Sequence, residues 1–345
     1  MFPLEQLEQT LSHFRKLTSI PSPTGMTRDA ENYVLAELTR MGYVPVHERK
    51  GTVIVHLGGS GHPLLMTAHL DTLGAVVRSI KPNGCLRYQA IGGWNDNSIE
   101  NENVLIHTVS GKVFTGTVQS VHASRHVWGD TTAEPRSNTA DEIVLDEKVT
   151  TKEATEALGI RAGDMVSFDP RTVVTESGFV KSRHIDDRAA AAMLLTLAEE
   201  VANGNITLGR EVILAFTVYE EIGHGASSLG KLDVEDMIAI DMGCVGDDLN
   251  AREWQVSICA KDRIGPYDRA LTTELIRRSE ALGIDYAVDV YPMYSSDAAT
   301  ALHAGLDARF ACFGMATFAS HGYERTHVDA LRGCLKLMAD VVSHI

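Results

Sequence analysis

Two adjacent glutamates, Glu220 and Glu221, follow the apolar run V-I-L-A-F-T-V, which is typical of a buried β-strand. Burying one carboxylate costs free energy unless another group compensates its charge, and burying two together costs more because like charges repel. Either both side chains therefore lie in solvent at the end of the strand, or a cation binds them.

Metal-ligating residue types also stand at the ends of four other predicted elements. They are His69 with Asp71, Asp186 with Asp187, Asp241, and His321 with His327. His69 and Asp241 follow strand-like runs, as the two glutamates do. In open α/β sheets, ligands bind beyond the carboxyl ends of the strands, so these side chains are expected to converge there. The shared placement predicts a metal site.

Each of these residues also has an ordinary structural interpretation. Asp186 or Asp187 could cap the helix that begins there, because an aspartate at a helix N-terminus stabilises the helix. His69 could be a histidine of the core, and Asp241 could form a turn before Gly243. The metal site is favoured because several separate structural explanations would have to coincide at one topological place.

The elements that would position these residues predict an α/β fold. Apolar residues at helical spacing mark 3–17 and 27–41, and strand-like runs at 52–57 and 63–68 follow them. From about residue 186 onward, helical and strand-like stretches alternate, which is typical of a sheet covered by helices on both faces. We therefore predict a three-layer α/β/α domain built on a mixed sheet.

The stretch 75–175 has a different composition. It is rich in β-branched residues and glycines, which predicts short strands joined by tight turns, with one helical patch at 152–160. We predict a small, barrel-like β-rich domain inserted there. Residues 1–74 and 176–345 would then form one discontinuous catalytic domain.

Composition argues against several classes of function. The 345 residues include 31 basic and 46 acidic side chains, and the formal charge of −15 repels phosphate backbones and anionic lipids, so neither nucleic acid nor membrane is expected as a partner. No uninterrupted apolar stretch approaches the length of about 18 residues that spans a membrane, and the N-terminus lacks a signal-peptide pattern. Five scattered cysteines without C-x-x-C spacing favour a reducing, cytoplasmic location.

In combination, these motifs resemble the M42 metallopeptidases, a family of cytosolic dinuclear aminopeptidases. The catalytic part matches at A-H-L-D (68–71), I-D-D-R (185–188), E-E-I-G-H-G-A (220–226), I-D-M (240–242), S-S-D-A (295–298) and Y-E-R-T-H (323–327). The insert matches at I-G-G-W (91–94), G-T-V-Q-S-V-H (116–122) and L-G-I-R-A-G-D (158–164). The resemblance therefore covers nearly the whole chain.

The resemblance implies a role for each candidate residue. His69 and Asp241 would hold one metal ion, Glu221 and His327 a second, and Asp186 would bridge both. Nitrogen and carboxylate ligands without thiolates suit zinc first, with cobalt and manganese as alternatives. Asp71 would orient the imidazole of His69, and Glu220 would be the general base.

The imidazole of the second metal is not settled by the sequence alone. His321 lies close enough to His327 in the chain to compete for that position. The resemblance favours His327.

The resemblance further implies an aminopeptidase that removes N-terminal residues from short peptides. The insert would mediate homo-oligomerisation, as dimers that could build a tetrahedral dodecamer. A dinuclear deacylase or carboxypeptidase would use nearly the same ligands but usually carries a different insert. A glycosidase is disfavoured because neighbouring strand residues point to opposite faces, which makes Glu220 and Glu221 a poor acid–base pair. A non-catalytic homologue is disfavoured by the complete ligand set.

Overall fold

The computed structural model describes residues 4–129 and 136–344. The chain divides into a main unit, Met1–Asp71 with Arg171–Ile345, and an inserted unit, Thr72–Pro170. The sequence-based boundaries of the insert, 75–175, lie close to these positions. No helix among the described residues is long and apolar enough to cross a membrane.

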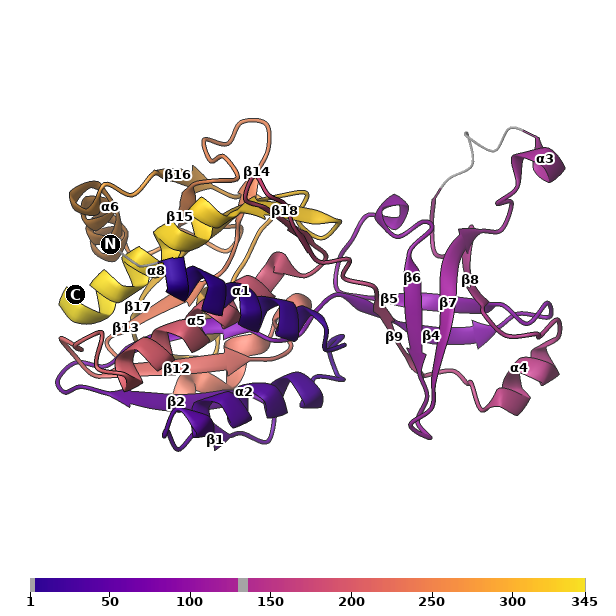
Figure 1. The fold of residues 1–345 in the computed structure, drawn as a ribbon, viewed down its shortest axis with the longest axis horizontal. Helices are drawn as coiled ribbons and strands as arrows, with labels where there is room; N and C mark the ends of the chain where they lie inside the picture. Colours follow the sequence, from indigo (N-terminus) through magenta and orange to yellow (C-terminus); the bar gives the residue numbers. More distant parts are fainter. Residues whose placement is uncertain (1–3, 130–135, 345) are drawn as a thin grey trace. The chain divides into compact units, whose positions relative to one another are not determined.

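The main unit is built on a twelve-stranded mixed sheet (Figure 1). Its strands are β1 (Val46–His47), β2 (Val53–Gly58), β3 (Leu64–His69), β10 (Val173–Val174), β11 (Phe179–Ser182), β12 (Val212–Thr217), β13 (Asp236–Ile240), β14 (Gly243–Val245), β15 (Val256–Lys261), β16 (Tyr286–Val290), β17 (Arg309–Phe318) and β18 (Glu324–His327). The main path runs β1-β2-β12-β3-β13-β17-β18-β11-β10, with β14 and β15 also pairing with β17. The central strands β12, β3, β13 and β17 are parallel, so their carboxyl ends lie at one edge.

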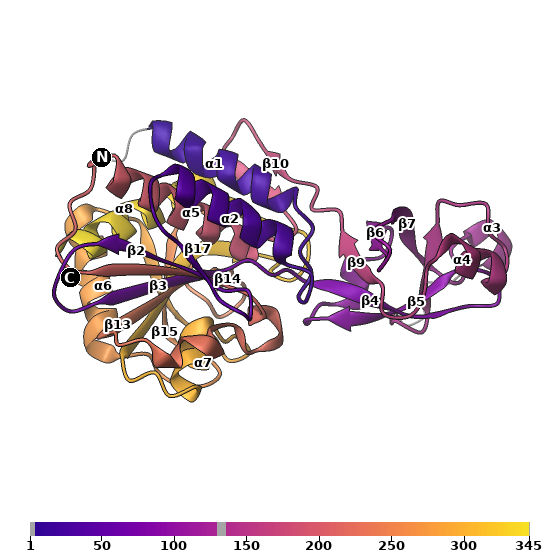
Figure 2. The same ribbon diagram turned by 90° about the horizontal axis from the view of Figure 1, so that it is seen from below.

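Helices cover both faces of this sheet (Figure 2). They are α1 (Leu4–Thr18), α2 (Arg28–Arg40), α5 (Ile185–Ala202), α6 (Arg269–Leu282), α7 (Asp297–His303) and α8 (Val328–His344), with the short 3₁₀ turns η2 (Glu220–Ile222) and η3 (Gly225–Lys231). Side chains of α1, α2, α5, α6 and α8 pack on one face, and those of α7 and η3 pack on the other. The prediction of a three-layer α/β fold with a mixed sheet is confirmed.

The alternation of side chains along the strands builds the two cores. In β3, Leu64 and Met66 contact the larger helical layer, whereas Leu65 faces the layer of α7 and η3. A strand that is buried on both faces reads as a continuous apolar run, which explains the sequence of β3 and β12. Burial of these strands fixes their ends, and the candidate site lies at those ends.

Helix α5 reaches the same edge because its sequence permits close packing. Ala189, Ala190, Ala191 and Ala192 are all almost completely buried, and α5 contacts α1 and β3. Regular helical geometry begins only after Asp187, so the two aspartates of the I-D-D-R motif stand at the entrance of the helix.

The inserted unit is a closed antiparallel barrel in the order β4-β5-β8-β7-β6-β9. Its strands are β4 (Gly74–Ile80), β5 (Leu86–Ile91), β6 (Asn103–His107), β7 (Val113–Ser120), β8 (Asp141–Leu145) and β9 (Met165–Phe168), and its short helices are η1 (Asp96–Ser98), α3 (Arg125–Trp128) and α4 (Lys152–Leu158). A separate apolar core fills the barrel. This confirms the predicted barrel-like β-rich fold of the insert.

Candidate metal centre

The candidate site lies at the carboxyl ends of three adjacent parallel strands. His69 is the last residue of β3, Glu220 and Glu221 follow β12, and Asp241 follows β13. Because β3 lies between β12 and β13 in the sheet, the strand ends bring these side chains to one place.

Two imidazoles and two carboxylates form the centre of the cluster. His69 Nε2 lies 2.9 Å from Asp186 Oδ1, and His321 Nε2 lies 3.4 Å from Asp186 Oδ2. His321 Nε2 is also 3.5 Å from Glu221 Oε2. The carboxylate of Asp186 thus has one oxygen toward each histidine, which is the arrangement that a bridging ligand requires.

The donor atoms are close enough together to hold cations. One set comprises His69, Asp187 and Asp241, and a second comprises His69, Asp186 and Glu221; within each set the ligand atoms lie within 4.8 Å of one another. Asp187 Oδ1, Glu221 Oε1 and Asp241 Oδ1 are buried and accept no hydrogen bond from any described residue. Buried carboxylate oxygens are normally satisfied, so these three atoms point to a missing positive partner.

Burial and like charge dominate the electrostatics of the cluster. Burial raises the pKa of Glu220 well above its ordinary value, and the carboxylate of Asp241 raises it further. Burial also raises the pKa of Glu221 and that of Asp241, each to about 8. Burial alone would lower the pKa of His321, but the carboxylates of Glu221 and Asp186 raise it to about 11. A site with this excess of buried carboxylates is suited to divalent cations.

Asp71 holds the backbone next to the cluster through hydrogen bonds to its buried carboxylate. Its Oδ1 accepts a hydrogen bond from the backbone amide of Glu220 at 3.1 Å, and its Oδ2 accepts one from the amide of Glu221 at 3.3 Å. Thr24 Oγ1 donates to the same Oδ2 at 2.7 Å. The Nδ1 of His69 lies 3.0 Å from the carbonyl oxygen of Asp71 and 3.6 Å from its carboxylate.

The family of the chain follows from a match over most of its length. A model of the family described as M42 glutamyl aminopeptidase matches residues 51–337. The chain belongs to the M42 aminopeptidase family. It is 42% identical over 338 residues to YhfE of Bacillus subtilis strain 168, a protein named as a candidate aminopeptidase, with 97% of each chain covered.

Solved structures show the same fold. The TET1 peptidase of Pyrococcus horikoshii, described as assembling into a tetrahedron or a large octahedral shell, superposes with a TM-score of 0.86 at 23% identity, covering 97% of this chain and 100% of that one. The TET aminopeptidase of the archaeon Thaumarchaeota SCGC AB-539-E09 has a TM-score of 0.88 at 18% identity, with 97% of each chain covered. As an M42 member, this chain is a peptidase of the hydrolase class.

One residue of the predicted ligand set lies outside the cluster. His327 directs its Nε2 to the carbonyl oxygen of Ser177 at 2.9 Å, and its Nδ1 accepts the backbone amide of Asp329 at 3.1 Å. Its ring packs edge-on against Phe179 at 5.0 Å. Both ring nitrogens are therefore engaged away from the acidic centre, and His321 occupies the position expected for His327.

Sequence reasoning also missed Glu324, which lies three residues after His321. Its carboxylate is buried and accepts the backbone amide of Asp186 through Oε2 and that of His321 through Oε1, both at 3.0 Å. Glu324 therefore joins the two segments that carry the bridging carboxylate and the second imidazole. The spacing H-x-x-E was the available signal.

A cavity of about 720 Å³ opens beside the centre. Asp186, Glu220, Glu221, Asp241 and His321 line one part of it. Apolar side chains line much of the rest, namely Ile222, Met242, Leu249, Val290, Tyr291, Pro292, Met293 and Tyr294. A peptide end could enter this cavity and reach the acidic centre.

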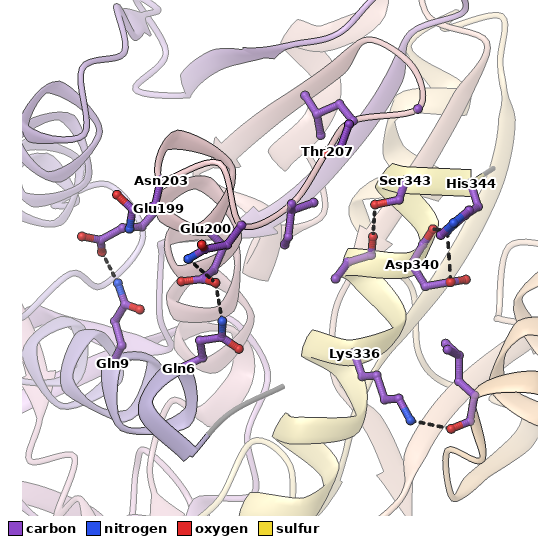
Figure 3. A pocket seen from close by; sticks show the side chains of 16 residues that line it. Gln6, Gln9, Glu199, Glu200, Asn203, Thr207, Lys336, Asp340, Ser343 and His344 are labelled. Atoms are coloured by element: carbon purple, nitrogen blue, oxygen red, sulfur yellow. Dashed lines mark hydrogen bonds and ion pairs between the residues drawn. The ribbon is translucent and has the colours of Figure 1, made fainter. Parts of the chain in front are cut away.

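A larger cavity of about 1230 Å³ lies where the chain leads into β12, at the amino end of that strand (Figure 3). Its acidic side chains already have partners: Gln9 donates to Glu199, and Gln6 donates to Glu200. It contains no cluster of metal-ligating side chains among the described residues. The smaller cavity is therefore the candidate active site.

Proposed function

We propose that this protein is a dinuclear metal-dependent aminopeptidase that removes N-terminal residues from short peptides. The observation that carries the proposal is the carboxylate of Asp186, which faces His69 with one oxygen and His321 with the other. Membership of the M42 family supports the reaction class.

The residues fit two divalent cations. His69 and Asp241 would hold one ion, Glu221 and His321 the other, and Asp186 would bridge them. The buried oxygens without partners on Glu221 and Asp241 belong to this set. Imidazole and carboxylate donors without thiolate suit zinc, with cobalt and manganese as alternatives.

Two cations in this centre would polarise the peptide carbonyl and lower the pKa of water. Glu220 acts as the general base: it accepts a proton from the attacking water and donates it to the leaving amine. The water oxygen bonds to the carbonyl carbon as the C–N bond breaks. Glu220 Oε2 lies 3.8 Å from His69 Nε2, so the base stands beside the centre.

Homo-oligomerisation is part of the same proposal. The neighbouring TET1 structures are described as a dodecamer and as tetrahedral or octahedral shells. We propose that the inserted unit forms dimers and that dimers build a tetrahedral dodecamer, which would restrict substrates to short peptides. Light scattering that showed only a monomer at working concentration would reject this assembly and leave the chemistry intact.

Metal removal tests the central claim. Dialysis against a chelator should abolish hydrolysis of aminoacyl-anilides, and added zinc, cobalt or manganese should restore it. N-acylated amino acids serve as the control substrate, because a dinuclear deacylase would prefer them. Full activity in protein that elemental analysis shows to be metal-free would contradict the proposal.

A further inference from the structure

The turn that carries both glutamates has little regular structure of its own. It links β12 to η3, and both Tyr219 and Gly223 have left-handed backbone angles, with φ of 74° and 82°. A non-glycine residue in that region is strained, and such a conformation persists only where surrounding contacts impose it. The contacts that hold the turn therefore determine where Glu220 and Glu221 point.

Asp297, the first residue of α7, holds the exit of the turn. Its buried carboxylate accepts the backbone amide of Ala226 at 2.7 Å and the hydroxyl of Thr217, the last residue of β12. One side chain thus ties the end of the strand to Ala226, near the end of the turn. The backbone packs so closely here that a Cβ atom on Gly225 would overlap Asp297 Oδ1.

Lys50, between β1 and β2, also holds this turn. Its half-buried ammonium donates to the carbonyl oxygens of His224 and Gly225, the latter at 2.7 Å, and to Ser227 Oγ at 2.8 Å. These three contacts match the three donors of a lysine ammonium. The ammonium also lies 5.7 Å from the ring centre of Tyr219, whose ring stacks on His224.

The charges of these two residues support each other. Burial lowers the pKa of Lys50, while the carboxylates of Asp297 and Asp71 oppose that effect, which places the three groups within electrostatic reach. Asp71 holds the amides of both glutamates, Asp297 holds the amide of Ala226, and Lys50 holds the intervening carbonyls. The turn is therefore fastened along its whole length by charged side chains from three other segments.

We propose that Lys50 and Asp297 are positioning residues that hold the 219–227 turn in the conformation that aims Glu220 and Glu221 into the metal centre. Neither residue lines the cavity beside the centre or belongs to the metal-ligating sets. Lys50 acts on hydrolysis through the turn. Asp297 does so too, and its charge adds to the burial that raises the pKa of Glu220. The effect on rate therefore rests on the proposed function. The claim that these two residues hold the conformation of the turn is independent of the proposed function.

Two measurements on Lys50→Met test this. Amide hydrogen exchange of the 219–227 peptide, measured in metal-free protein, should speed up at least tenfold relative to wild type. In the metal-loaded enzyme, kcat should fall about 10–100-fold, because small displacements of a catalytic group cost that much, while KM and bound metal stay within twofold. Lys50→Arg, which keeps the cation, should recover most of both properties.

Lys231→Met is the matched control. Lys231 lies at the end of η3, and its ammonium pairs with Glu48, a residue of the same loop as Lys50. The Lys231→Met variant should match wild type in the amide hydrogen exchange of the 219–227 peptide and in kcat. Unchanged exchange of the 219–227 peptide in Lys50→Met, or equal effects in Lys50→Met and Lys231→Met, would overturn the proposal. A wild-type protein without aminopeptidase activity would reject the proposed function. The exchange data would still decide whether Lys50 holds the turn.

Discussion

The carboxylate of Asp71 accepts the backbone amide of Glu220 at 3.1 Å, and its second oxygen accepts the amide of Glu221 at 3.3 Å. The residue that was expected to orient His69 thus contacts the glutamate pair directly, whereas His69 Nδ1 lies nearer to the carbonyl oxygen of Asp71 than to its carboxylate. His69 and Glu220, the proposed metal ligand and the proposed general base, are thus connected through one buried residue.

Asp71→Asn should therefore affect the base as well as the ligand. The asparagine amide presents N–H groups toward one of the two backbone donors, which leaves a buried donor unpaired. We expect kcat/KM for aminoacyl-anilides to fall about 10–100-fold, a loss of the size that misplaced catalytic groups produce. Thr24→Ala is the control because it removes only the third hydrogen bond to Asp71, and it should lower kcat/KM by less than about threefold. Equal losses in both variants would contradict this account.

The positions of His69 and Asp241 were predictable from the sequence because hydrophobic runs reveal parallel strands and hence their carboxyl ends. The choice between His321 and His327 was not. Ala319 and His321 have left-handed backbone angles, with φ of 57° and 62°, and this loop geometry turns His321 inward. His327 instead pairs with Phe179 in the register between β18 and β11, which no pattern of apolar residues reveals.

Contacts between distant segments were also beyond the sequence. Lys50 and His224 are 174 positions apart, and nothing in the residues near Lys50 distinguishes it from an ordinary exposed lysine. The barrel-like insert, by contrast, was predictable in type because β-branched residues and turns recur locally along it. Local patterns therefore predict elements, while the partners of charged side chains depend on tertiary packing.

Substitution of the two histidines distinguishes their roles. His321→Ala should lose one of two bound metal ions and at least about 100-fold in kcat, because its Nε2 faces Asp186 and Glu221. His327→Ala should keep both ions and near-normal kcat. It should lower the free energy of unfolding by about 1 kcal/mol, because the hydrogen bonds of His327 are lost. Elemental analysis, steady-state kinetics and thermal unfolding provide the three readouts. Loss of metal in His327→Ala alone would restore the original assignment.

The cavity wall predicts the preferred N-terminal residue. The hydroxyl of Tyr291 hydrogen-bonds with Ser257, and that of Tyr294 lies 3.7 Å from Cys312 Sγ and also bonds the carboxylate of Asp241. Much of the remaining wall is apolar. Acidic substrate side chains would meet Asp247 and Asp248 as well as Arg263. We expect leucyl- and methionyl-anilides to exceed glutamyl- and lysyl-anilides at least tenfold in kcat/KM, in line with about 1–3 kcal/mol per buried methylene. A glutamyl-anilide hydrolysed faster than a leucyl-anilide would refute this preference.

The two glutamates should separate chemistry from metal binding. Glu220→Gln keeps the size of the side chain and removes the base, and loss of a general base typically lowers the rate about 10²–10⁴-fold. Its metal content should stay near that of wild type, because the proposed ligand is Glu221. Glu221→Gln removes a charged ligand that lies 3.5 Å from His321 Nε2, so this variant should lose one ion.

The base is identified by opposite effects of the two variants, which are lost activity with retained metal in Glu220→Gln and lost metal in Glu221→Gln. If Glu220→Gln loses metal while Glu221→Gln stays loaded but inactive, the two roles are exchanged. Adding excess zinc, cobalt or manganese to each variant separates weak binding from lost chemistry: it should rescue Glu221→Gln in part and leave Glu220→Gln unchanged, because added metal cannot replace a proton acceptor. Near-normal turnover in both variants would show that neither carboxylate takes part, and the proposed aminopeptidase mechanism at this centre would then fail.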